Sequence, residues 1–256
     1  MLIDTHCHIN SEELRLDARE IIARAREANV RKMLIVGCDY EDSCEAVAMA
    51  EDFSQYGLYA SIGIHPHEAK RYDNVPDEFS ILLKNKRVVA FGEIGLDYYY
   101  DHSPRDVQQR MFELQLEFAE KYNMPVILHI RDAMLDAMNI LRRHHGLKLL
   151  FHCYSGGLDF LDDVLDLGGM CGFGGAITWN NATSEELRKV LMAIPIENVL
   201  FETDSPYMSP IPFRGRTNEP AYIKYVYEVA AQELKMNIGK LEKQIETNAK
   251  NFFGWE

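Results

Sequence analysis

The chain opens with the stretch MLIDTHCHI (residues 1–9), in which the apolar pair Leu2 and Ile3 runs directly into Asp4-Thr5-His6-Cys7-His8. Side chains two residues apart in a β-strand point to the same face, so His6 and His8 can face one point. Two imidazoles that converge on one point are typical of a transition-metal site. The stretch therefore predicts the first strand of a barrel, with metal ligands at the carboxyl end of that strand.

Strand-like apolar runs alternate with helical patterns along the rest of the chain. We expect strands at residues 2–6, 33–38, 58–64, 88–93, 125–130, 148–152, 169–174 and 198–203, and helices at 18–29, 41–53, 104–122, 133–145, 159–167, 184–193, 220–234 and 238–252. Such alternation implies parallel strands joined by crossovers. It predicts an α/β fold, a closed TIM (β/α)8 barrel. A doubly wound open sheet is the alternative, because the sequence does not give the strand order.

Length and composition agree with one large domain over residues 1–256. The chain has 256 residues, a typical size for such a barrel, and no Gly-, Ser- or Pro-rich linker divides it. The five cysteines are odd in number and widely spaced, which disfavours a disulfide framework. We see no secretion signal and no membrane-spanning run, so we expect a cytoplasmic protein that does not enter membranes. A net charge of −13 disfavours non-specific adhesion to long duplexes.

Imidazole and carboxylate side chains recur at or just past the ends of the expected strands. They are His6, His8, Glu93, His129, His152 and Asp204. In a barrel these positions converge at one face, where barrel active sites lie. Burying such groups is costly unless they are paired or bind a metal. Their joint occurrence predicts a site for two divalent cations.

Further side chains are candidates for substrate contact. His65 lies in a tight turn between Gly63 and Pro66, where a structural role is an equal alternative. Arg131 follows His129, and Arg214 and Arg216 lie in the irregular stretch 205–219, which would lie over the barrel mouth. The planar guanidinium matches phosphate geometry, although ion pairing to the many acids is an equal alternative. We expect His67 to be a solvated loop residue, and we assign no chemistry to His144 and His145, which precede Gly146 at a helix end. His102 lies in an aromatic loop that could stack on a base or simply cover the fourth strand.

The motifs, taken in order, resemble those of the TatD family of metal-dependent hydrolases. The matching segments are residues 4–8 (DTHCH), 63–66 (GIHP), 92–98 (GEIGLDY), 125–133 (PVILHIRDA), 152–156 (HCYSG), 202–207 (ETDSPY) and 214–220 (RGRTNEP). The resemblance implies a TIM barrel of the amidohydrolase type and a divalent-metal deoxyribonuclease. It also implies one cation held by His6, His8, Glu93 and Asp204, and a second held by His129, His152 and a bridging Glu93.

These inferences lead to a hypothesis of phosphodiester hydrolysis, most simply by an exonuclease that acts on single-stranded DNA or a DNA end. Two Mg²⁺, Mn²⁺ or Zn²⁺ ions would activate water, with Glu93 and Asp204 as catalytic residues and Asp204 as general base. One rival is hydrolysis of an ester, amide or aminoacyl ester on the same site. Another is a non-catalytic, metal-stabilised binding protein, although nothing in the sequence indicates an obligate protein partner.

Overall fold

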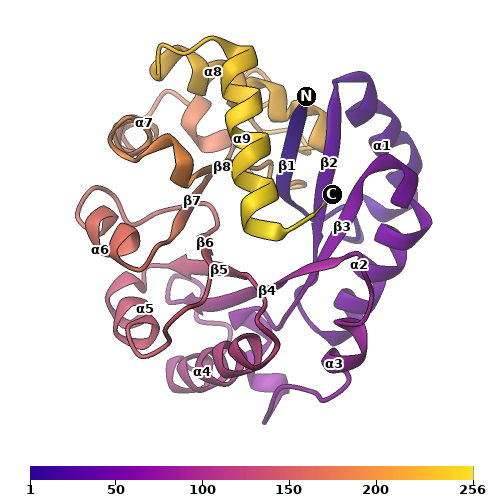
Figure 1. Cartoon of the computed structure of the whole chain (residues 1–256), viewed down its shortest axis with the longest axis vertical. Coiled ribbons are helices and arrows are strands. Elements are labelled where there is room, and N and C mark those ends of the chain that lie inside the picture. The colour runs from indigo at the N-terminus through magenta and orange to yellow at the C-terminus, as the bar shows by residue number, and fades with distance from the viewer. Residues whose placement is uncertain (256) are drawn as a thin grey trace.

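The strands form a single parallel sheet in a computed structural model that describes residues 1–255. Within this range the strand order is β1 to β8 without interruption (Figure 1). The bounds are β1 Leu2–Cys7, β2 Val30–Val36, β3 Leu58–Ile62, β4 Val88–Asp97, β5 Val126–Arg131, β6 Leu149–Phe151, β7 Met170–Phe173 and β8 Val199–Phe201. Every neighbouring pair is parallel, as crossover connections require.

The end of β8 meets the end of β1 and closes the sheet into a barrel. Cys7 and Ser205 form a parallel bridge. The amide of His8 donates to the Ser205 carbonyl at 2.7 Å, and the amide of Asp204 donates to the His6 carbonyl at 2.9 Å. The predicted (β/α)8 barrel is confirmed, and the open-sheet alternative is wrong.

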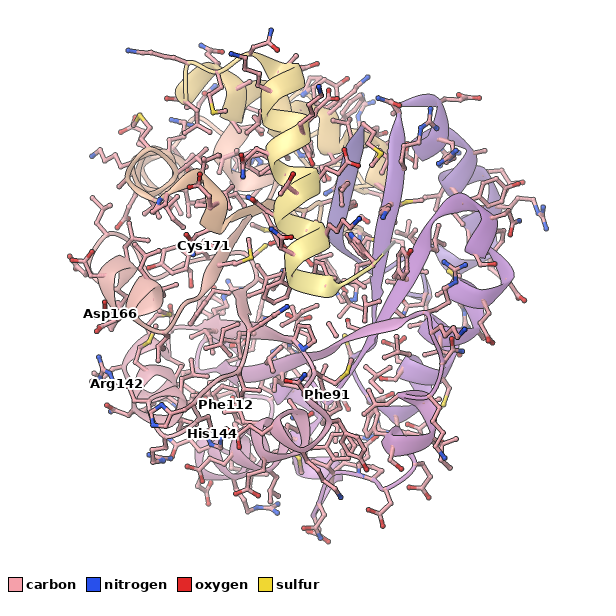
Figure 2. All side chains as sticks on the ribbon, in the orientation of Figure 1. Phe91, Phe112, Arg142, His144, Asp166 and Cys171 are labelled. Atoms are coloured by element: carbon pink, nitrogen blue, oxygen red, sulfur yellow. The ribbon has the colours of Figure 1, made fainter. Side chains whose placement is uncertain are left out.

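Helices connect the strands and surround the barrel. Their bounds are α1 Ala18–Glu27, α2 Tyr40–Asp52, α3 Phe79–Leu82, α4 Arg105–Tyr122, α5 Met134–Leu141, α6 Leu161–Asp166, α7 Ala182–Ala193, α8 Ile223–Glu233 and α9 Ile238–Phe253. Side chains fill both the barrel and the layer between strands and helices; Figure 2 labels the buried rings of Phe91 on β4 and Phe112 on α4. No helix within residues 1–255 combines the length and the hydrophobicity needed to cross a membrane.

Helix α9 lies across the end of the barrel at which the strands begin. The Asn248 amide donates to the carbonyls of Ile196 and Val199, just before and at the start of β8. Lys148, which precedes β6, donates to the Asn251 carbonyl near the end of α9. Figure 1 shows α9 in front of β1 and β8. The carboxyl ends of the strands are therefore at the opposite, open face.

The largest difference from the predicted strands is in β4, which continues to Asp97 instead of ending at Glu93. All ten of its residues are buried. Gly95 has φ +146°, and a Cβ there would collide with the carbonyl oxygen of His129 on β5. The glycine therefore lets the two backbones approach closely, whereas in the sequence it resembles a strand terminator. The helix expected at 133–145 also ends early, at Leu141, and α3 was not predicted.

Candidate metal centre

The centre is built from the carboxyl ends of the strands, beginning with β1. His6 lies within β1 and His8 directly follows it, so the pleat turns both rings to the barrel mouth. Their Nε2 atoms are 3.1 Å apart and both rings are buried. The pKa of His6 is lowered by burial and by the neighbouring His152, which favours the neutral imidazole that binds metals.

Glu93, on β4, stands between two pairs of histidines. Its Oε2 atom is 3.4 Å from His6 Nε2 and 3.9 Å from His8 Nε2. Its Oε1 atom is 2.8 Å from His129 Nδ1 and 3.4 Å from His152 Nε2. Each carboxylate oxygen thus faces a different pair of imidazoles.

Asp204, just past β8, completes the ring of ligating groups. Its Oδ1 atom is 3.5 Å from His8 Nε2, 3.8 Å from His6 Nε2 and 4.0 Å from His152 Nε2. The structure thus brings together the six side chains predicted as ligands, within the carboxyl-end face of one barrel. Their role as metal ligands remains a prediction.

Both carboxyl groups of the centre are ionised at neutral pH. Burial by itself would raise the pKa of Glu93, but the charge of His152 and the hydrogen bonds from His129 and His6 hold it well below its usual range. Burial acts in the same direction on Asp204, yet the hydrogen bond from His8 and the charge of His152 lower its pKa. The centre therefore offers anionic oxygens beside imidazole nitrogens.

This donor set fits divalent cations. Among residues 1–255, groups of three potential ligand atoms within 4.8 Å of one another include His6-His8-Glu93, His65-Glu93-His129 and His152-Cys153-Asp204. The Nε2 atom of His6 lies 3.1 Å from the Nε2 atom of His8, so two imidazole nitrogens face each other beside the Glu93 carboxylate. A bound cation would satisfy these converging nitrogens and carboxylate oxygens together.

Two further carboxylates orient the histidines from behind. Asp97 Oδ2 is hydrogen-bonded to His129 Nε2 at 3.0 Å, and Glu202 Oε1 lies 3.1 Å from His152 Nδ1 without the geometry of a hydrogen bond. Such contacts fix the tautomer and the direction of a ligand ring. Sequence analysis did not assign Asp97, because β4 was expected to end before it. Glu93 and Asp97 are four residues apart, which places them on one face of a strand and was the available signal.

His65 belongs to the centre as well as to its turn. Its Nδ1 atom accepts a hydrogen bond from the amide of His67. The neutral ring therefore carries its proton on Nε2, which lies 4.0 Å from Glu93 Oε1. His67, expected to be a solvated loop residue, instead contacts Asp97 Oδ2 at 2.9 Å, so that expectation was wrong. His144 pairs with Glu120 on α4, away from the centre of the barrel (Figure 2).

The predicted arginines differ in position. The Arg131 guanidinium, at the end of β5, lies 4.1 Å from the ring centre of Tyr99 and 4.8 Å from that of Tyr100, and has no acidic partner within the described chain. Arg214 lies 4.6 Å from the ring centre of Trp179. Arg216 is exposed, and its carbonyl accepts from Ser209. Ion pairing to acids therefore does not explain Arg131 or Arg214.

A cavity of about 540 Å³ lies over the centre. We call it the polar pocket; its lining includes His8, Asn10, Asp42, His65, His67, Glu93, Asp97, His102, Arg131 and Asp204. Tyr207 and Met208, from the irregular stretch 205–219, also line it, which agrees with the predicted place of this stretch over the barrel mouth.

Known proteins resemble this chain over its whole length. The sequence model for TatD-related DNases matches residues 3–254. An uncharacterized metal-dependent hydrolase, YabD of Bacillus subtilis, is 35% identical, with 99% of both chains covered. A 3'-5' ssDNA/RNA exonuclease, TatD of Edwardsiella piscicida, is 33% identical over 98% of this chain and 99% of its own. The crystal structure of YjjV, a TatD homolog from Escherichia coli K12, has a TM-score of 0.91 at 29% identity, covering 100% of this chain and 98% of its own.

Proposed function

The chain belongs to the family of TatD-related DNases, and from this membership we propose that it is an exonuclease for single-stranded DNA. A metal-dependent hydrolase is the coarser description, shared with the YabD relative. The more specific proposal, an exonuclease for single-stranded DNA, draws on the relative named as a 3'-5' ssDNA/RNA exonuclease. That relative aligns over nearly the full length of both chains.

The position of Glu93 is the observation that carries the proposal. Its two oxygens face different histidine pairs, His6 with His8 and His129 with His152, at 2.8 to 3.9 Å. A carboxylate placed in this way can bridge two cations. We infer that His6, His8, Glu93 and Asp204 hold one ion and that Glu93, His129 and His152 hold the other.

We propose the identity of the ions from the chemistry of the same side chains. The four imidazoles of the inferred set suit Zn²⁺, and its two carboxylates also suit Mn²⁺, whereas Mg²⁺ usually keeps a shell of oxygen ligands. Metal analysis of the purified protein, with two equivalents of Zn²⁺ or Mn²⁺ per chain, is the expected result. A single equivalent would contradict the bridging role of Glu93.

Divalent ions bound here would supply Lewis-acid polarisation of a phosphoryl oxygen and lower the pKa of water. The chain's own groups handle the proton and the substrate. The ionised Asp204 carboxylate accepts the proton of the attacking water as general base. His65, with its proton on Nε2, and Arg131, without an acidic partner, donate to the phosphate oxygens from the polar pocket.

A nuclease assay on chelator-treated protein tests the function. Single-stranded DNA labelled at either end is incubated with Mg²⁺, Mn²⁺ or Zn²⁺, and Glu93→Gln is compared with the wild type. We expect metal-dependent shortening from one end, lost in Glu93→Gln. Glu197→Gln is the matched control, because Glu197 is exposed and precedes β8 at the far end of the barrel.

The assay also separates the rival chemistry. Turnover of carboxylic or aminoacyl esters by the metal-loaded protein, without cutting of any DNA, would replace the nuclease proposal with an acyl hydrolase on the same centre. We also propose a cytoplasmic location, supported by the five cysteines, all of which are free thiols, as is usual in a reducing compartment.

A further inference from the structure

A second cavity opens directly beside the metal centre, on the side of β6 and β7. Its volume is about 490 Å³, within the usual range of small-molecule sites. It shares His129, Arg131, His152, Asp204 and Met208 with the polar pocket. The two cavities therefore meet at the centre, and a group held there has one cavity on each side.

The walls of this second cavity are chemically unlike those of the polar pocket. They are mainly apolar and aromatic, with Tyr154, Phe173, Ile177, Trp179 and Leu187. We call this cavity the apolar pocket. Solvated phosphates gain nothing from such walls, whereas a flat heteroaromatic ring buries its faces in them.

The rim of the apolar pocket is formed by Trp179, which is held firmly in place. Its indole Nε1 donates to the Ser209 carbonyl at 2.9 Å. The Arg188 guanidinium donates to the carbonyls of Ile177 at 2.8 Å and Trp179 at 3.1 Å. Trp179 is half-buried and lines the apolar pocket. A stacking surface held in advance binds at a lower entropic cost.

Arg214 supplies a cation at the same rim. Its guanidinium stacks on Trp179 at 4.6 Å, and it has no ion pair among residues 1–255. Many proteins bind single-stranded nucleic acids with this combination. The aromatic ring stacks on a base, and the cation attracts a phosphate.

We propose that the apolar pocket receives one unstacked nucleobase of the substrate, next to the scissile phosphate at the metal centre. The inference rests on the proposed nuclease function and extends it to the choice of substrate. Trp179 stacks on the base, Arg214 contacts its flanking phosphate, and the rest of the strand leaves through the polar pocket. A base that is paired and stacked within a duplex cannot enter, so the pocket selects single strands and frayed ends.

A coupling experiment tests this assignment. The rate constant kcat/KM is measured on oligonucleotides with a normal base, or with an abasic tetrahydrofuran residue, at the terminal or the penultimate position. Trp179→Ala should lower kcat/KM roughly ten- to hundredfold on normal DNA. Trp179→Ala should have little effect on the abasic oligonucleotide whose missing base is the one that would enter the apolar pocket. An equal loss on all substrates, or no loss, would overturn the proposal.

Matched variants separate stacking from folding. Trp179→Phe keeps an aromatic face and should retain most of the activity on normal DNA. Arg214→Ala should raise KM with little change in kcat, whereas Arg142→Ala should not, because Arg142 pairs with Asp163 on the outside of the barrel. Figure 2 shows Arg142 at the edge of the molecule. Wild-type KM in Arg214→Ala would remove this arginine from the site.

Binding of a mononucleotide tests whether the apolar pocket holds a base, independently of catalysis. 2'-Deoxyadenosine 5'-monophosphate should quench tryptophan fluorescence in the wild type but not in Trp179→Phe, and 2-deoxyribose 5-phosphate should quench neither. Absence of DNA cutting with every metal would refute the nuclease function, while this quenching would still support a base in the pocket. Cutting without quenching would refute the pocket alone.

Discussion

Asp97 shows how one residue outside the ligand set can control it. Its Oδ2 atom contacts both His129 Nε2 and His67 Nε2, and its Oδ1 atom accepts from the amides of Tyr99 and Tyr100. We predict that Asp97→Asn weakens metal binding roughly ten- to hundredfold, because His129 loses the carboxylate that fixes its tautomer and direction. Isothermal titration with Zn²⁺ or Mn²⁺ measures the effect.

The neighbouring Asp101→Asn is the matched control. Asp101 is exposed on the same loop and pairs with Arg105, without contact to a histidine. Its substitution should leave metal affinity unchanged. Equal affinities for the Asp97 and Asp101 variants would mean that Asp97 has only a structural role.

The sequence was enough to predict the ligating residues of the site but not the residues that orient them. His6, His8, Glu93, His129, His152 and Asp204 were identified because strand ends of a barrel converge, whatever the details of the loops. Asp97 and Glu202 were not assigned an orienting role, since their partners are histidines on other strands. Contacts of that kind depend on the register between strands, which a single sequence does not give.

At the scale of the strand, Gly95 controls how closely β4 approaches β5. Gly95 pairs with His129, and a Cβ at its φ of +146° would meet the His129 carbonyl. We predict that Gly95→Ala lowers the free energy of unfolding by about 1–3 kcal/mol or more. It should also weaken metal binding, because His129 must move. Urea unfolding and metal titration measure the two effects.

Gly146→Ala provides the comparison. Gly146 also has positive φ, +84°, but a Cβ there meets nothing within 4 Å. Only the backbone conformation opposes the substitution, at a cost of about 1 kcal/mol, with no loss of metal affinity. If the two variants bind metal equally, the close approach of β4 and β5 does not position the centre.

The closure between β1 and β8 depends on a buried carboxylate. Asp4 accepts from the Thr203 amide at 2.9 Å and from the Thr203 hydroxyl at 2.6 Å. We predict that Thr203→Val destabilises the protein by about 1–3 kcal/mol, because an Asp4 oxygen loses its donor in the interior. Thr247→Val on the exposed face of α9 should change the urea midpoint little; equal shifts would contradict the role of Asp4 in closure.

Elements were easier to predict than their limits. The short strands β6, β7 and β8 were expected near their observed places because each is an apolar run between helical patterns. The continuation of β4 past Glu93 was missed because Gly95 lacks the side chain that marks a strand. The short helix α3 has too few residues for a periodic pattern to appear.

For the whole molecule, the centre links metal binding to stability. It places four imidazoles and two carboxylates from β1, β4, β5 and β6 and the end of β8 together. Ions that bind only the folded barrel stabilise it by about 2.7 kcal/mol at a hundredfold excess over Kd. We predict that chelation lowers Tm and that Zn²⁺ or Mn²⁺ restores it. Glu93→Gln should show a much smaller difference; an unchanged Tm on chelation would contradict the centre.

Helix α9 closes the end of the barrel where the strands begin, and packed side chains fill the interior. Among residues 1–255, the metal centre is therefore reached from the face where the strands end, through the polar pocket and the apolar pocket. A polymer cannot be threaded through the barrel, and whatever is cut off must leave by the way it came in. Each released fragment therefore leaves by the same face at which the incoming strand arrives.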